Sequence, residues 1–380
     1  MSEVYITKIS KYFPNSPVSN AEMEDYLGLI NERHSKTKGV VLRNNLIKNR
    51  YYALNKKGES THTNAQISAH SVRALFTDNP DEIKTIDLLA CGTSSPDQMF
   101  PSHGVMTHGE LPEMNTIEVV SPSGVCCAGM HALKYAYLSV KSEDKNKAVA
   151  VGSERFSAFL QAKKFKEEAV HLEELEKDPI IAFEKDFLRW MLSDGAGAVL
   201  LESQKAKEGF SFKIEWVEGV SYASEYETCM YSGAVKNKDK TLTGYLDMSN
   251  EEMLDQSALS IKQDVTLLSE NILGLGFKRL KEIFDSKGLT ADDIDWMLPH
   301  ISSFYFKDKI YDIFKSNDME ITWDKWFINL DKVGNVGAAS IYLMLEEIQK
   351  NGTLKIGDKV LLVVPESARF SYMFAWLTVC

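Results

Sequence analysis

Two adjacent cysteines, Cys126 and Cys127, stand in a stretch that reads SPSGVCCAGMHALKYA. A turn rich in serine, proline and glycine precedes them and an apolar run with helical spacing follows, which predicts a helix that begins at the pair. A cysteine there would face free backbone N–H groups and the positive end of the helix dipole, and both favour the nucleophilic thiolate. A buried structural cysteine is the alternative.

A histidine and an asparagine further along the chain offer matching chemistry. His300 follows the apolar run IDWMLP, and Asn335 lies in the turn VGNVG before another helical run. A histidine can orient groups or stabilise charge, and an asparagine amide can donate to a developing oxyanion or enolate. With Cys127 they would form a suitable set for thioester chemistry, but spacing alone does not establish that the three meet.

The elements that must position these residues occur twice. The run TIDLLACGTSS resembles DIDWMLPHISS, with Ile86 matching Ile294 at an offset of 208. The later pair CAGMHALKYAYLSVK…KAVAVGSERFS resembles ASIYLMLEEIQK…DKVLLVVPESARFS, with Glu154 matching Glu366 at an offset of 212. Alternating buried strands and helices indicate an α/β fold, and the repeat indicates two similar halves. Chance similarity between buried strands is the alternative.

The repeat also relates the candidate site residues. Cys127 matches Ala339 at the start of the second helical run, and Gly92 matches His300 at the end of the second strand. Functional side chains often lie at such element ends, where rigid structure presents loops. A pseudo-symmetric pair of halves could therefore bring Cys127, His300 and Asn335 together.

Composition narrows the function classes. The 380 residues are 44% hydrophobic and carry a formal net charge of −11, which disfavours nucleic acid as a partner. Five scattered cysteines argue against a disulfide framework, and no cysteine pair has metal-binding spacing, so we expect no metal. No run is long enough to span a membrane and no secretion signal is present, so we expect a cytoplasmic protein.

Five segments together resemble the thiolase-like condensing enzymes, specifically the β-ketoacyl-acyl-carrier-protein synthase III group. In chain order they are GTSSPDQMFPS, VCCAGMHAL, MLSDGAGAVLLE, IDWMLPHISS and VGNVGAASIYLML. The resemblance implies a thiolase-like fold of two pseudo-symmetric α/β halves, residues 1–205 and 206–380, layered α-β-α-β-α. It also implies a homodimer that catalyses Claisen-type condensation of an acyl thioester with a malonyl or β-ketoacyl thioester.

The resemblance assigns roles to individual residues. The family's nucleophile directly precedes a small residue and a glycine, here Ala128-Gly129, which implies Cys127 as the nucleophile and Cys126 as a packing residue. It implies His300 and Asn335 as the other catalytic residues. In place of the family's glycine-rich C-terminal loop stands PESARF, where alignment on its phenylalanine makes the backbone N–H of Ala368 the candidate oxyanion donor.

PESARFSY and PHISS look more like the stand-alone ketosynthases of aryl-polyene and dialkylresorcinol pathways, some of which close a cyclohexanedione ring. That similarity makes Glu154 a candidate base for ring closure, with an ion pair to Arg155 or Arg189 as the alternative role. Two extra segments, Phe156–Arg189 and Tyr222–Leu259, would shape a larger acyl pocket. A simple initiator of fatty-acid synthesis and a non-catalytic partner subunit on the same fold are the alternative functions.

A basic segment, RNNLIKNRYYALNKKG, stands out in this acidic chain. It would suit an acidic acyl carrier protein or the phosphates of coenzyme A, whose phosphopantetheine thioesters are the expected substrates; no cofactor is expected. A solvated surface is the alternative. The cationic residues concerned are Arg43, Lys48, Arg50, Lys56 and Lys57.

Overall fold

A nine-stranded mixed sheet dominates the computed structural model, which describes residues 2–30, 32–164 and 188–380. The strand order is β13-β14-β15-β8-β1-β7-β6-β4-β5. The strands of the first part of the chain are β1 (Tyr5–Tyr12), β4 (Leu88–Gly92), β5 (Glu118–Val120), β6 (Lys147–Glu154) and β7 (Gly195–Glu202). Those of the second part are β8 (Phe212–Ser221), β13 (Trp296–Pro299), β14 (Lys359–Glu366) and β15 (Ser371–Val379).

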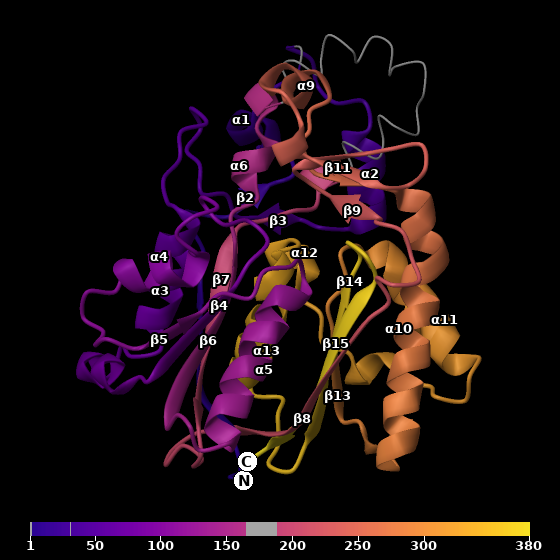
Figure 1. The fold of residues 1–380 in the computed structure, drawn as a ribbon. Helices are drawn as coiled ribbons and strands as arrows, with labels where there is room; N and C mark the ends of the chain where they lie inside the picture. The colour runs from indigo at the N-terminus through magenta and orange to yellow at the C-terminus, as the bar shows by residue number, and fades with distance from the viewer. Residues whose placement is uncertain (1, 31, 165–187) are drawn as a thin grey trace.

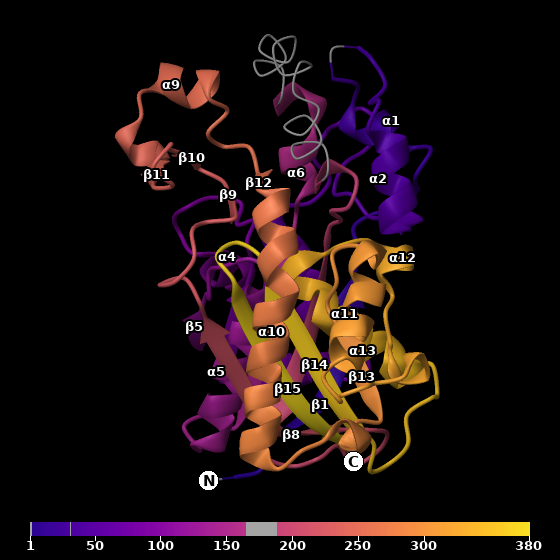
Figure 2. The ribbon, with the colours of Figure 1, turned by 90° about the vertical axis from the view of Figure 1, so that its right-hand side faces the viewer.

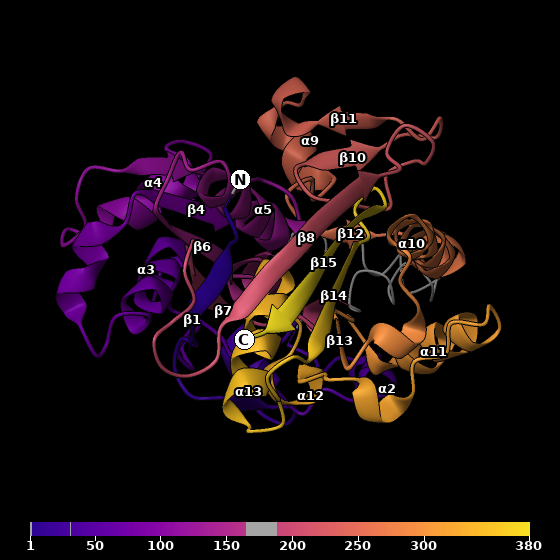
Figure 3. The same ribbon diagram turned by 90° about the horizontal axis from the view of Figure 1, so that it is seen from below.

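The strand order is a palindrome about the contact between β1 and β8, with β5 added at one edge. β1 and β8 pair antiparallel through Tyr5 with Lys213 and Ile6 with Phe212, as seen from below in Figure 3. Outward from this contact, β7 corresponds to β15, β6 to β14 and β4 to β13. The bounds of β6 and β14 differ by the offset of 212 predicted from the repeat. The proposed division at residues 205 and 206 falls between β7 and β8.

Helices fill the space between the two halves of the sheet and cover both outer faces. α5 (Cys127–Lys141) and α13 (Ser340–Lys350) lie in the middle layer of Figure 1. α3 (Asn64–Ala74) and α4 (His103–Gly109) cover the half formed by β4, β6 and β7. α10 (Val265–Lys287) and α11 (Lys307–Lys315) cover β13, β14 and β15, as Figure 2 shows from the side. The five predicted layers are therefore confirmed.

Burial on both faces explains the composition of the inner strands. In β6, KAVAVGSE, every residue after Lys147 is buried, because α3 lies on one side and α5 on the other. Strands covered on both faces favour continuous apolar runs of small and β-branched residues. The largest hydrophobic cluster joins α5 and α13 to both halves of the sheet, so the two halves share one core.

Two glycines let the halves approach closely near the start of α5. A Cβ on Gly129 would lie 2.1 Å from the carbonyl oxygen of Ala338, and a Cβ on Gly152 would lie 2.2 Å from the same atom. Neither distance is tolerable for a real side chain, so both positions need glycine. This contact brings the turn that carries Asn335 against the helix that carries the cysteines.

Shorter elements gather at one end of the molecule, opposite to the two termini in Figures 1 and 2. The segment 222–259, which we expected to enlarge the pocket, forms a small subdomain there. Of the other extra segment, Phe156–Arg189, residues 165–187 lie outside the described part of the chain. Within the described residues, no helix combines the length and apolar character needed to cross a membrane. The short elements at this end are β2 (Val18–Ser19), α1 (Met23–Leu27), α2 (Lys38–Asn45), β3 (Asn49–Arg50), α6 (Ser157–Leu160), β9 (Met230–Tyr231), β10 (Ala234–Lys236), β11 (Leu242–Gly244), α9 (Asn250–Asp255), β12 (Lys262–Gln263) and α12 (Leu330–Val333).

Candidate active site

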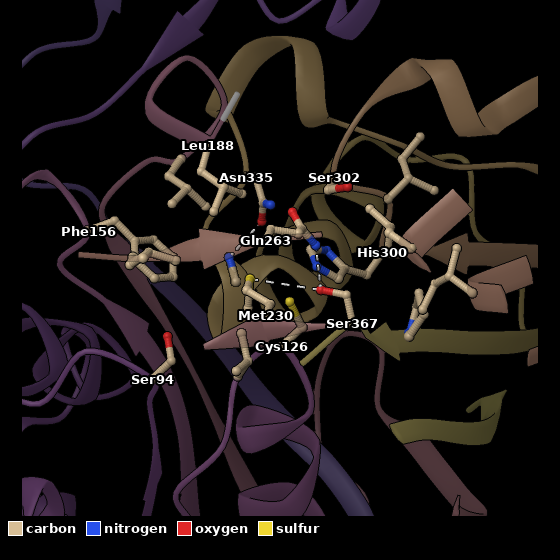
Figure 4. A pocket seen from close by; sticks show the side chains of 18 of the residues that line it. Ser94, Cys126, Phe156, Leu188, Met230, Gln263, His300, Ser302, Asn335 and Ser367 are labelled. Atoms are coloured by element: carbon tan, nitrogen blue, oxygen red, sulfur yellow. Dashed lines mark hydrogen bonds between the residues drawn. The ribbon is translucent and has the colours of Figure 1, made fainter. Parts of the chain in front are cut away.

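A cavity of about 170 Å³ lies where the two halves meet below these short elements. His300 and Asn335 from the second half and Cys126 from the first half line it together, as Figure 4 shows. Most of the remaining wall is apolar, as expected for a site that binds an aliphatic chain. The large apolar residues of the wall are Phe156, Phe159, Leu188, Leu192, Ile261, Leu268, Ile272, Leu273, Ile301, Phe306 and Ile310.

His300 is held at the cavity by the end of β13. Its backbone N–H donates to the carbonyl oxygen of Val363 on β14, at 2.8 Å. Only 4% of the residue is exposed, and burial lowers the pKa of its imidazole to about 4. The ring is therefore neutral near pH 7, so it can donate one hydrogen bond without bringing a full charge into an apolar site.

Asn335 is fixed by both its backbone and its side chain. Its N–H donates to Met191 and its carbonyl oxygen accepts from Ser193, each at 2.9 Å. Its side-chain Oδ1 accepts from the N–H of Gly337 at 3.0 Å. With the oxygen occupied inside the turn, the amide NH₂ is the group that can donate to a molecule in the cavity.

The two cysteines point in different directions. Cys127 is fully buried in the core between the sheet halves, and its thiol donates to the carbonyl oxygen of Val364 at 3.3 Å. Cys126, the residue before α5, is partly exposed and contributes to the cavity wall, where its sulfur lies on the same side as His300 in Figure 4. From the sequence we expected Cys126 to be a packing residue only. Its place on the cavity wall differs from that expectation because its side chain points toward the cavity.

Two glutamates link the halves crosswise, and they are the pair that the internal repeat matched. Glu154 at the end of β6 accepts the N–H of Ala338 beside the Asn335 turn, at 3.2 Å. Glu366 at the end of β14 accepts the N–H groups of Val125 and Cys127 at the start of α5, both at 2.9 Å. Each carboxylate thus stabilises the N-terminal turn of the helix from the other half. The repeat could have revealed this pairing, but its role was missed.

Glu154 is fully buried just behind the cavity wall. Hydroxyl and amide donors surround it, including the Ser94 hydroxyl at 2.8 Å, and Ser94 itself lines the cavity. Burial raises the pKa of Glu154 to about 7, although the serine hydrogen bonds oppose that rise. The alternative role for Glu154, an ion pair with Arg155 or Arg189, is wrong: within the described residues, Arg155 pairs with Asp97 and Glu154 has only neutral partners.

Ala368 does not line the cavity, although its neighbours Pro365 and Ser367 do. Its carbonyl oxygen accepts the N–H groups of Cys229 and Met230, at 2.8 and 3.1 Å. This contact fastens the C-terminal loop to the 222–259 segment. The role of the Ala368 N–H as an oxyanion donor stays a prediction.

Within the described part of the chain, only some of the cationic side chains in the basic segment 43–58 are exposed and without a nearby acidic residue. Arg50 is fully buried, and its guanidinium donates to the carbonyl oxygen of Trp190 and to Asn20, so its expected contact with a carrier is wrong. Lys48 lies near Asp331 and Lys56 near Glu22, at 3.6 and 3.5 Å. Two other cations of the segment, Arg43 and Lys57, are exposed.

Known proteins resemble this chain in sequence along most of its length. Residues 284–365, which contain His300 and Asn335, match the family of the C-terminal part of 3-oxoacyl-[acyl-carrier-protein (ACP)] synthase III. The β-ketoacyl-[acyl-carrier-protein] synthase III of Bradyrhizobium sp. is 24% identical over 351 residues, which cover 92% of this chain and 91% of that relative. The same enzyme of Chlorobaculum tepidum is 24% identical over 361 residues, 94% of each chain. In sequence, the chain is thus similar to the ketosynthase III family of condensing enzymes.

Solved structures share the fold of this chain. AbyA1, a tetronic acid condensing enzyme, matches with a TM-score of 0.75 at 18% identity over 99% of both chains. OleA from Xanthomonas campestris, solved with lauric acid and lauroyl-CoA, matches with a TM-score of 0.75 at 17% identity over 99% of both. The synthase III (FabH) from Thermus thermophilus gives 0.72 at 20% identity over 98% of both. The predicted thiolase-like fold is confirmed.

Proposed function

We propose that this ketosynthase joins an acyl thioester to a malonyl or β-ketoacyl thioester by a Claisen-type condensation. The observation that carries the proposal is that His300 and Asn335, from separate turns, share one mostly apolar cavity with a cysteine thiol. The named relatives are acyl-carrier-protein synthases, and one neighbour was solved with lauroyl-CoA, which supports phosphopantetheine thioesters as substrates. The carrier would be an acyl carrier protein or coenzyme A.

In the first step, a cysteine thiol loses its proton and its sulfur attacks the thioester carbonyl carbon. The carbonyl oxygen takes the negative charge until the carrier sulfur leaves as a thiol with the proton, and an acyl-cysteine remains. The candidate donor for that oxygen is the Cys127 N–H at the start of α5, which in the empty site donates to Glu366 and would have to be released from it.

The family motif predicts that Cys127 carries the acyl group. For this, the Cys127 thiol has to leave the Val364 carbonyl oxygen and turn toward the cavity, which requires a rotation about one side-chain bond. Cys126 is the second candidate because its side chain already lies on the cavity wall. The geometry thus favours Cys126 and the motif favours Cys127.

In the second step, the second substrate forms an enolate by loss of CO₂ from a malonyl group or of a proton from a β-ketoacyl group. The enolate carbon attacks the acyl-cysteine carbonyl, so the new C–C bond forms and the bond from that carbonyl carbon to the cysteine sulfur breaks. The sulfur leaves as a thiolate and takes up a proton, which restores the thiol. His300 and Asn335 would donate to the enolate oxygen. A neutral His300 suits this role, because it stabilises the developing charge without an ion pair in the resting site.

Acylation mapping tests the proposal. The purified protein is incubated with lauroyl-CoA, and the adduct is located by peptide mass spectrometry in the parent, Cys126→Ala and Cys127→Ala. We expect an adduct that Cys127→Ala abolishes and Cys126→Ala retains. The reverse pattern would assign the nucleophile to Cys126. No adduct in any form, with natively folded protein, would contradict the condensing function and favour a non-catalytic partner subunit.

Ring closure to a cyclohexanedione is the finer proposal. A second C–C bond requires a base, and the hydrogen-bonded pair Ser94–Glu154 connects a carboxylate with a pKa of about 7 to the cavity. We expect Ser94→Ala and Glu154→Gln to make the linear condensation product from acyl and β-ketoacyl thioesters but little cyclic product. If the parent yields only linear product, the enzyme is a linear ketosynthase, such as an initiator of fatty-acid synthesis.

A further inference from the structure

Glu366 brings a carboxylate to the first turn of the helix that carries the cysteines. α5 is 15 residues long, and the residue that precedes it, Cys126, provides no side-chain cap. Instead, one oxygen of Glu366 accepts both the Val125 and the Cys127 N–H groups, 239 or more positions away in the sequence. Glu366 is only 9% exposed, so this contact lies inside the protein.

The two crossed glutamates differ in their surroundings. Glu154 is also surrounded by the hydroxyl groups of Thr93, Ser94 and Ser95, which share its charge. Glu366 interacts with α5 through backbone N–H groups and lies beside two thiols. Burial is the main cause that raises the pKa of Cys126 and Cys127, and the charge of Glu366 is the next.

We propose that Glu366 is a positioning residue that holds the turn of the two cysteines from the other half of the molecule and suppresses their reactivity while the site is empty. The catalytic importance of this role rests on the proposed function, in which one of these cysteines carries the acyl group. An N–H group that already donates to a carboxylate is not free for the oxygen of a thioester, and a nearby negative charge disfavours a thiolate. The bound thioester oxygen therefore has to displace the carboxylate from the Cys127 N–H.

Other ionisable groups also act on this turn. The charge of Glu366 reaches His131 on α5, and Glu154 acts on Cys126 from β6. Tyr372 on β15 faces Cys127, but its hydroxyl donates to the carbonyl oxygen of Ile272, so it is neutral. Since Glu154 and His131 are unchanged in Glu366 variants, a change in thiol titration in those variants reports Glu366.

The test is the pH dependence of thiol alkylation in the full-length, substrate-free protein. Iodoacetamide labelling of Cys126 and Cys127 is followed separately by peptide mass spectrometry between pH 7 and pH 10. Glu366→Gln keeps a hydrogen-bond acceptor and removes the charge, so labelling at pH 8 should be about three- to tenfold faster, with the profile shifted to lower pH. Glu208→Gln, an exposed site with the same charge change, should keep the parent profile.

Glu366→Asp distinguishes the effect of the carboxylate charge from that of the side-chain length. It also tests the proposal if Glu366→Gln does not fold. Aspartate keeps the charge on a shorter side chain, so the melting temperature should fall while the labelling profile stays near that of the parent. An unchanged profile in folded Glu366→Gln, or a shift in Glu366→Asp to lower pH, would overturn the proposal. Acylation of the parent by lauroyl-CoA is measured in parallel, so a failure of the proposed function is seen independently of the labelling result.

Discussion

At the residue scale, different residues are expected to serve the two steps of the proposed reaction. In that reaction His300 and Asn335, which line the cavity, would donate to the enolate, whereas one of the two cysteines would form the acyl-enzyme. We therefore expect His300→Ala and Asn335→Ala to acylate at nearly the parent rate and to condense about 10²- to 10³-fold more slowly, the usual loss for one oxyanion donor. Single-turnover assays that follow acyl-enzyme formation and product separately would measure this.

A second histidine provides the control. His131 lies one helical turn beyond the cysteines and is exposed. His131→Ala should acylate and condense like the parent. If it were as impaired in condensation as His300→Ala, or if the His300 and Asn335 variants kept the parent rate, the assigned roles would be wrong.

At the scale of elements, the burial of Glu154 at the end of β6 predicts a pH-dependent stability. Burial raises the pKa of Glu154 to about 7 in the folded protein, whereas it is near 4.5 when unfolded. The folded state therefore binds the proton more tightly, and the contribution of Glu154 to stability is lost as pH rises from about 4.5 through about 7. A shift of this size corresponds to roughly 3 kcal/mol.

Glu154→Gln should remove this dependence, because glutamine does not ionise. We expect the unfolding free energy of the variant minus that of the parent to become more positive from pH 5 to pH 8, because only the parent loses stability over this range. Urea denaturation at both pH values would measure the difference. A constant difference would show that Glu154 does not titrate in this range.

At the scale of the whole molecule, one edge of the sheet suggests self-association. β5 pairs with β4 on one side and has no neighbouring strand on the other within the described residues. α4 packs on β5, and the loop before α4 exposes 61% of Met99 and 84% of Phe100. A bare strand edge and exposed apolar side chains favour pairing with a second copy across a two-fold axis.

Light scattering should therefore give twice the chain mass of 42.8 kDa. Phe100→Lys should shift the protein toward the monomer, while Leu246→Lys, at a similarly exposed residue in the 222–259 segment, should not. A stable monomer of the parent at micromolar concentration would contradict the homodimer.

The secondary-structure elements, their duplication and the resemblance to the ketosynthase III family could all be predicted from the sequence. Apolar runs and the helical spacing of apolar residues are local properties of a sequence. They predicted β4, α5, β6, β13, α13 and β14 at the places where the structure has them. The motifs also led to His300 and Asn335, which follow β13 and precede α13 in the second half and which the structure brings to one cavity.

The directions of individual side chains followed only from tertiary packing. At the start of α5, neighbouring side chains point in different directions, so packing between the halves places Cys127 in the core and Cys126 on the cavity wall. Arg50 appeared basic and exposed in the sequence, but Trp190 buries it from a position 140 residues away. Glu366 caps α5 from the far end of the chain, a contact that no local pattern contains. Such long-range contacts depend on how the halves pack.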